Sequence, residues 1–260
     1  MIKIFAVALL LITHSAFPGE QEAKAFRTLI ESRGPLRANV AEDLRLRTTK
    51  GFNQGSSVLC WAFATLNILE TNFLERHPEV SPDQIELSRW ALGYHGRNTY
   101  GTMANALDTY IAKFGLVMDA DYALDSGPPP LLTKFLDTTL TPIELSKRVL
   151  ENLKYSSYGF IGNRTGWHQH PDQDALPGTR AYYLKRSKMR ELIITSLKKR
   201  LAIYIAREGH GTVIYGATFD SNGEPITYHI KDSGGDYFYE GDAELVHDEI
   251  WEVDTYAGFK

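Results

Sequence analysis

Cysteine is almost absent from this chain of 260 residues, which carries one, Cys60. A single cysteine cannot form a disulfide within the chain, so a fold stabilised by internal disulfides is excluded. An excess of one charge is also missing, because 28 Lys and Arg face 32 Asp and Glu for a net charge of −4. The basic run Lys198–Arg200 is short and typical of a solvated helix end. We therefore expect no nucleic-acid partner.

Long apolar runs are missing as well. The run Ile4–Ile12 is too short to span a bilayer as a helix. Lys3 precedes it and the small residues Ser15 and Ala16 follow it, which is the order of segments in a secretory signal peptide. The alternative is a buried N-terminal strand. We expect residues 1–19 to be a signal peptide cleaved near Ala16, no integral membrane segment after its removal, and a secreted or periplasmic protein.

The remaining composition is that of an ordinary globular protein, with 43% hydrophobic and 23% charged residues. Residues 20–50 are polar and predict an N-terminal arm or the first turn of the domain. Residues 51–260 predict one domain that buries a substantial core. Within it, about 125–180 is rich in proline, glycine and aromatic residues without periodicity, which predicts an insertion over a cleft.

Apolar spacing divides the domain into a helical half and a strand-rich half. Helices are expected from Cys60 through Leu74, from the capping-box pattern Ser81–Gln84, and after Gly101. The second half predicts a helix followed by strands: helix 189–199, strand 201–205, a hairpin of 212–220 and 226–231, and a terminal strand at 251–253. This order indicates an α+β fold with a site where the two halves meet.

Cys60 follows a Gly/Ser-rich loop and begins the first helix of this domain. A thiol at a helix N-terminus faces the positive end of the helix dipole, which favours the thiolate. Gln54, six residues upstream, offers a side-chain amide that can donate to a developing oxyanion. An unpaired cysteine in an exported protein is a liability unless it reacts usefully, so we interpret Cys60 as a nucleophile. The alternative is a buried, inert cysteine.

A nucleophilic cysteine needs a base and a group that orients the base. Of the eight histidines, His210 lies between Gly209 and Gly211, directly before an apolar strand, where backbone and substrate can approach an imidazole closely. The predicted hairpin returns the chain so that Asp232 lies roughly opposite His210. Asp232 can then accept a hydrogen bond from the ring and fix its tautomer. The alternatives are an ordinary loop histidine and a strand-end cap.

The segment Asn53–Ala64 resembles the papain-like cysteine peptidases, in which a glutamine lies six residues before a cysteine followed by Trp-Ala-Phe. Gly209-His210 is similar to the catalytic histidine motif of that family, and Tyr228–Gly235 to its strand with the third catalytic residue. The resemblance covers about residues 50–123 and 190–255. The missing disulfides and the insertion are more similar to the bleomycin hydrolase-like branch than to papain itself.

The resemblance implies a papain-like α+β fold and an exported cysteine-type peptidase, a thiol protease that forms a thioester acyl-enzyme. It implies Cys60 as nucleophile, His210 as general base and acid, Asp232 as orienting group and Gln54 as oxyanion donor. Gly101 and Gly209 would contact the substrate, a peptide or protein. No cofactor is implied.

Three departures from the family pattern bear on this interpretation. Asp232 replaces the usual asparagine, Gly234 replaces the tryptophan that shields the pair, and Val58-Leu59 replaces small residues before the cysteine. Two alternatives therefore stay open. One is a non-catalytic papain-fold protein that binds peptides, and the other is an acyltransferase or amidase that uses the same triad on a non-protein substrate.

A metal site is not expected. His168 and His170, with Asp172 and Asp174, have a spacing that puts alternate residues on one face of a strand. The sequence shows no second ligand set to complete such a site. We interpret the segment as a solvated loop.

Overall fold

The computed structural model of the chain describes residues 18–31, 39–55, 57–95, 101, 103, 106–111, 116, 118–119, 180–207, 209–235, 237–250 and 252–255. Residues 1–17 of the expected signal peptide lie outside this part. So do all of the expected insertion except residue 180, the segment with His168 and His170, and Ser56 in the loop before Cys60.

A six-stranded sheet of order β5-β4-β3-β2-β6, with β1 paired to β3, forms one half of the described structure. The strands are β1 (Glu42–Arg45), β2 (Ile203–Arg207), β3 (His210–Phe219), β4 (Pro225–Lys231), β5 (Phe238–Asp242) and β6 (Glu252–Thr255). All of their pairings are antiparallel. β3 and β4 form the expected hairpin, whose turn needs the positive φ of Gly223 (80°).

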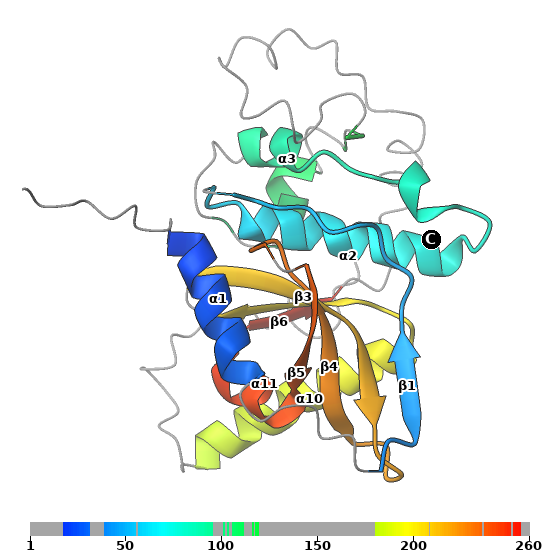
Figure 1. The fold of residues 1–260 in the computed structure, drawn as a ribbon, viewed down its shortest axis with the longest axis vertical. Coiled ribbons are helices and arrows are strands. Elements are labelled where there is room, and N and C mark those ends of the chain that lie inside the picture. The colour runs from blue at the N-terminus through cyan, green and yellow to red at the C-terminus, as the bar shows by residue number, and fades with distance from the viewer. Residues whose placement is uncertain are drawn as a thin grey trace, which may run out of the picture.

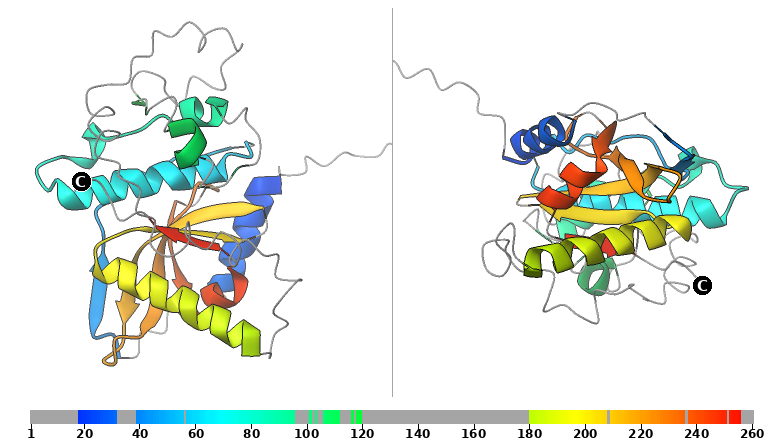
Figure 2. Two further views of the ribbon diagram at one scale, coloured as in Figure 1. Left: turned by 180° about the vertical axis from the view of Figure 1, so that it is seen from behind. Right: turned by 90° about the horizontal axis from the view of Figure 1, so that it is seen from below.

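Helices lie on both sides of this sheet, and the chain has the predicted α+β architecture (Figure 1). They are α1 (Pro18–Ile30), α2 (Cys60–Arg76), α3 (Arg89–His95), α10 (Arg180–Lys198) and α11 (Ala243–Glu249), with the short segments η1 (Pro82–Gln84) and η2 (Ala106–Ile111). Helix α2 packs against β2 and β3, while α10 packs against β2, β3 and β6 from the opposite side (Figure 2). None of the helices in the described ranges combines the length and apolar character needed to cross a membrane.

Helix α2 is the centre of the core, since every residue from Cys60 to Leu74 is buried. It packs between the sheet and the pair α3 and η2, which is why apolar residues surround it instead of forming one stripe. Its buried polar side chains have partners: Thr65 donates to Trp61 O at 2.7 Å, and Asn72 accepts from Ala202 N at 2.8 Å. The helix ends at Arg76, where the His77-Pro78 sequence predicted its end.

The capping-box pattern at Ser81–Gln84 forms a single 3₁₀ turn, η1, and the longer helix expected after it is absent. The capping box itself is present, with Ser81 N donating to Gln84 Oε1 at 2.9 Å. The helix does not continue because Leu87 N donates instead to the Glu70 carboxylate at 2.7 Å. Leu87 also pairs with Met118 in an isolated β-bridge. A tertiary partner thus replaces the local helical hydrogen bond.

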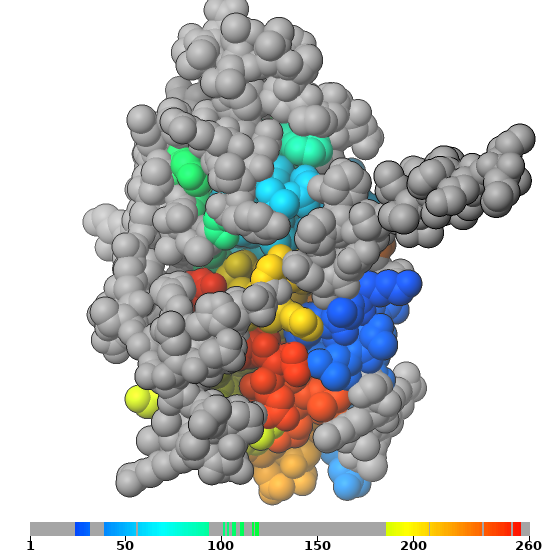
Figure 3. Space-filling model, turned by 90° about the vertical axis from the view of Figure 1, so that its left-hand side faces the viewer, coloured from blue at the N-terminus to red at the C-terminus, as the bar shows by residue number. Residues whose placement is uncertain are grey.

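Residues 20–50, expected as an arm or the first turn of the domain, contribute a helix and a strand to the body of the domain. Phe26 and Ile30 of α1 are buried in the core, and α1 lies beside α11 on the surface (Figure 3). Strand β1 pairs with β3 from Glu42↔Phe219 to Arg45↔Gly216. The mainly exposed side chains of β1 give no alternating pattern, so the sequence did not predict this strand.

Candidate active site

Cys60 is the first residue of α2, as predicted, and its side chain is buried beside the start of β3. Its Sγ donates to the carbonyl of Gly209 across 3.8 Å. The N-cap residue is Leu59, which supplies no side-chain cap. Ala62 N and Phe63 N donate to the Leu59 carbonyl at 2.8 and 3.0 Å, and the thiol of Cys60 lies at the positive end of the helix dipole, which favours an anion.

His210 and Asp232 make the contact that the hairpin predicted. His210 Nε2 lies 2.8 Å from Asp232 Oδ1, and the two side chains are 0% and 2% exposed. An ionised carboxylate only accepts, so Nε2 carries the proton of this hydrogen bond. Nδ1 is buried without a hydrogen-bond partner among the described residues. It is the ring nitrogen left for the Cys60 sulfur.

The charge state of His210 is set by these two neighbours. Burial lowers the pKa of the ring, but the charge and hydrogen bond of Asp232, followed by the neighbouring Cys60, raise it to about 10. Burial raises the pKa of Asp232, and the charge and hydrogen bond of His210 outweigh it and lower that pKa. The pair therefore favours an imidazolium next to sulfur near neutral pH. A cation in that place stabilises a thiolate.

Four hydrogen bonds hold Gln54 in the loop before Cys60, and in one of them Ser57 N donates to the Gln54 backbone oxygen at 3.1 Å. Its backbone N donates to Ser233 O at 2.9 Å, its Oε1 accepts from Ser233 Oγ at 2.6 Å, and its Nε2 donates to Ser57 O at 3.0 Å. Because Ser233 occupies Oε1, the amide orientation is fixed. Within the described ranges Nε2 has one acceptor, so its second proton is left for another.

The structure shows what the departures from the family pattern at Gly234 and Val58-Leu59 do to the site. His210 and Asp232 are shielded from water even though Gly234 has no side chain. Leu59 is fully buried and packs against Gly93, where a Cβ would lie 2.4 Å from a Leu59 methyl carbon. It points into the core, so it does not narrow a cleft. Val58 is partly exposed.

The two glycines expected to contact substrate lie at the same end of α2. Gly209 has φ 73° and presents its carbonyl to Cys60 Sγ. Gly101 lies against Trp61, and a Cβ there would come 2.7 Å from an indole carbon. The packing of Trp61 thus explains the glycine at 101, and a role for either residue in substrate binding remains a prediction.

If Gln54 is the oxyanion donor that the sequence predicts, replacing it by alanine is expected to lower kcat by about 10²–10³-fold. Gln84→Ala is the matched control. Gln84 follows the C-terminal end of α2, roughly 25 Å of helix away from Cys60, and its loss removes only the exposed cap of η1. Steady-state peptide hydrolysis with thermal unfolding of each variant makes the comparison. Equal losses of kcat in both variants would contradict the assignment.

Two residues that contact this site were not predicted. Ser233 holds the Gln54 amide, and Tyr239 donates its hydroxyl to Asp232 Oδ2 at 2.8 Å. Ser233 directly follows Asp232, so its position next to a predicted site residue could have indicated its role. Tyr239 lies on β5. Predicting its role therefore required predicting that a strand after Asp232 returns and pairs with β4. The sequence Phe238–Asp242 has too few apolar residues to show that strand.

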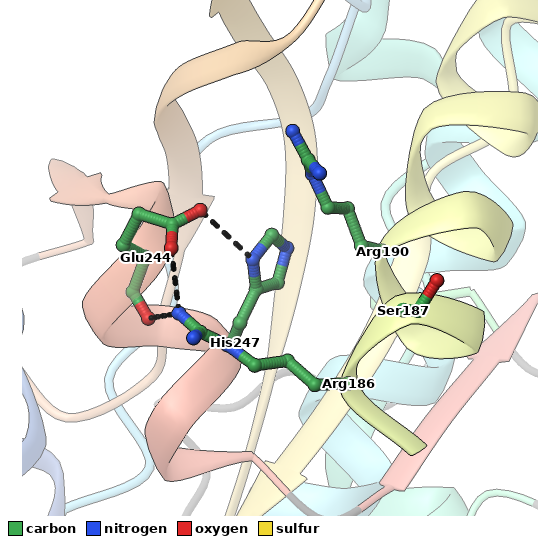
Figure 4. A pocket seen from close by; sticks show the side chains of 5 residues that line it. All are labelled: Arg186, Ser187, Arg190, Glu244 and His247. Atoms are coloured by element: carbon green, nitrogen blue, oxygen red, sulfur yellow. Dashed lines mark hydrogen bonds and ion pairs between the residues drawn. The ribbon is translucent and has the colours of Figure 1, made fainter. Parts of the chain in front are cut away.

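A pocket of about 170 Å³ lies between α10 and α11, away from these residues (Figure 4). It is lined by Arg186, Ser187, Arg190, Glu244 and His247. Its arginines already have carboxylate partners, since Arg186 pairs with Glu244 and Asp248, and Arg190 with Glu224. None of the predicted site residues lines it. Among the described residues no cluster of metal-ligating side chains was found.

Comparison with known proteins identifies the fold. No family model matches the sequence, and no curated protein matches it significantly. The structure is similar to the bromelain protease from Ananas comosus in complex with the E64 inhibitor, with a TM-score of 0.50 and 14% identity over 82% of this chain and 94% of that one. It is also similar to a recombinant stem bromelain precursor, with a TM-score of 0.51 and 15% identity over 84% of this chain and 70% of that one.

A ragweed pollen cysteine protease in its proform, Amb a 11, gives a TM-score of 0.46 and 14% identity over 85% of this chain and 66% of that one. The fold assignment rests on the two bromelain structures. The α+β fold of the chain is papain-like, as its motifs predicted.

Proposed function

We propose that the chain is an exported cysteine-type peptidase of the papain-like family. The observation that carries the proposal is the arrangement of His210: Nε2 is held by Asp232 at 2.8 Å, and Nδ1 is buried without a partner in the described structure beside Cys60. A buried polar atom without a partner is rare and needs an explanation. Proton exchange with a nucleophilic thiol supplies one. The bleomycin hydrolase-like branch has no support from the bromelain neighbours, so we propose the family alone.

In the proposed reaction, the Cys60 thiolate attacks the carbonyl carbon of a peptide bond, and the carbonyl oxygen becomes an oxyanion. Gln54 Nε2 and the backbone N–H of Cys60 donate to that oxygen. His210 transfers its proton to the leaving amine as the C–N bond breaks, which leaves a thioester on Cys60. His210 then takes a proton from water, whose oxygen attacks the thioester, and the acid leaves as the Cys60 thiolate and the His210 imidazolium are regenerated.

The test is covalent labelling followed by product analysis. A thiol-directed epoxide is expected to label the mature protein once, at Cys60, and to stop its hydrolysis of a peptide library at the same stoichiometry. Adding an amine acceptor separates hydrolysis from acyl transfer, because transfer yields the amine-linked product. A labelled protein that cleaves no peptide, but binds peptides or transfers an acyl group, would replace the proposal with one of those two activities.

A further inference from the structure

The third group of the candidate triad is a carboxylate, and each of its oxygens accepts a hydrogen bond. Oδ1 of Asp232 accepts from His210 Nε2, from Ser233 N at 2.6 Å and from Gly234 N at 3.1 Å. Oδ2 accepts from Tyr239 Oη at 2.8 Å. Backbone N–H groups and the histidine thus fix one oxygen. The other oxygen depends on one side chain.

Tyr239 is the side chain that donates to Oδ2. It lies on β5, opposite Ile230 of the neighbouring β4, and is 7% exposed. The Arg27 guanidinium of α1 lies 5.3 Å from its ring centroid. Burial and then the Asp232 charge raise the pKa of Tyr239 well above its ordinary value, so the phenol keeps its proton. Asp232 is the one hydrogen-bond partner of Tyr239 Oη in the part of the chain that the structure describes.

An amide at position 232 would not suit this environment. If its oxygen took the place of Oδ1, its NH₂ group would take the place of Oδ2 and face the Tyr239 hydroxyl. The amide could then donate to the phenol oxygen, but the phenol proton would have no acceptor among the described residues, and a buried donor without an acceptor is costly. The environment around Oδ2 therefore fits a carboxylate and disfavours the amide.

We propose that Tyr239 is the positioning residue of the catalytic site, donating to Asp232 Oδ2 so that a carboxylate, and not an amide, orients His210. The inference rests on the proposed function for its catalytic meaning. Tyr239 acts through Asp232 and touches neither Cys60 nor substrate in this role.

The hydrogen bond from Tyr239 affects the pH dependence of the site in a defined direction. It stabilises the ionised carboxylate, and it is among the causes that hold the pKa of Asp232 low against burial, after the charge and hydrogen bond of His210. Removing the hydroxyl raises that pKa, so Asp232 becomes protonated at a higher pH. The reactivity of Cys60 falls on the acidic side of its pH profile, and this acidic limb then moves towards higher pH. A hydrogen bond to a charged group is worth roughly one pH unit or more.

The experiment measures the second-order alkylation of Cys60 by iodoacetamide between pH 3 and 9, together with peptide hydrolysis. Alkylation reports on the one cysteine whether or not a substrate is known. Four proteins are compared: wild type, Tyr239→Phe, Asp232→Asn and the double variant. We expect Tyr239→Phe to move the acidic limb up by about one unit and to lower kcat/KM about tenfold. In the Asp232→Asn background the same change is expected to leave the limb in place, because no carboxylate remains for Tyr239 to stabilise.

Tyr228→Phe is the matched control, since Tyr228 is an equally buried tyrosine on β4 whose hydroxyl lies 2.7 Å from His247 Nε2. It is expected to lose stability without moving the limb. An unmoved limb in Tyr239→Phe, or the same shift in the Asp232→Asn background or in the control, would overturn the inference. If Tyr239→Phe does not fold, the double variant decides, because a limb displaced from that of Asp232→Asn also overturns the inference. A shifted alkylation profile without peptide cleavage would reject only the proposed function.

Discussion

Replacing Cys60 by alanine is expected to lower peptide hydrolysis by on the order of 10⁴-fold or more, to the limit of detection. The variant has no atom that can form the thioester, and no other cysteine can substitute. The fold should survive because the lost contacts are small: Sγ makes a long hydrogen bond with Gly209 O at 3.8 Å. The measurement is kcat/KM on the best library peptide, with thermal unfolding in parallel.

Peptide binding separates the proposed enzyme from its non-catalytic alternative. With His210, Asp232 and Gln54 intact, Cys60→Ala should still bind the peptides that the wild type cleaves, as measured by fluorescence anisotropy. Undiminished hydrolysis in the variant would show that Cys60 is not the nucleophile. Equal binding by a wild type that cleaves nothing would instead support a papain-fold peptide-binding protein.

Local signals were enough to predict much of this site. The apolar spacing after Cys60 predicted α2, and the turn at 221–224 predicted the β3–β4 hairpin. The hairpin in turn brought His210 and Asp232 together, because antiparallel strands place distant residues opposite each other. The helix expected at 189–199 was predicted too short, since α10 begins at Arg180 and its first residues are mainly charged.

The features that the sequence did not predict are those that depend on tertiary partners. Strand β1 is held by pairing with β3, and β5 by pairing with β4, and neither has alternating apolar residues. Helix α11 did have a local signal, the N-cap Asp242, whose carboxylate accepts from Glu244 N and Leu245 N. Tyr239 could not be assigned without β5, and with it the environment of Asp232 Oδ2 was missed.

The largest effect on stability is expected from a buried ion pair in the helical half. Glu70 of α2 and Arg89 of α3 form two hydrogen bonds of 2.6 Å, and both side chains are fully buried. Glu70 also accepts from Leu87 N at 2.7 Å and from Thr49 Oγ1 at 2.5 Å. Thr49 Oγ1 in turn accepts from Lys231 Nζ at 2.7 Å. The Glu70 carboxylate therefore pairs with the buried cation of Arg89 directly and with that of Lys231 through Thr49.

Lys231 extends this network to the residue before Asp232. Burial lowers the pKa of Lys231 to about 7, and the Glu70 carboxylate opposes that shift. Without Glu70 the ammonium would lose a stabilising charge while Arg89 stays buried. The network thus joins the packing of α2 and α3 to the strand that carries the third group of the site.

Glu70→Ala is expected to cost about 3–5 kcal/mol of unfolding free energy, because it leaves a buried guanidinium without its counter-charge. That is a large fraction of the roughly 5–15 kcal/mol by which native proteins are stable, and urea unfolding followed by circular dichroism measures it. Glu31→Ala is the control, since its pair with Arg27 is about one third exposed and should cost less than about 1 kcal/mol. Glu70→Met with Arg89→Met should recover part of the loss, since the buried guanidinium is then removed together with its carboxylate. A loss for Glu70→Ala no larger than that of Glu31→Ala would show that Arg89 finds another partner and that the pair does not hold α2 to α3.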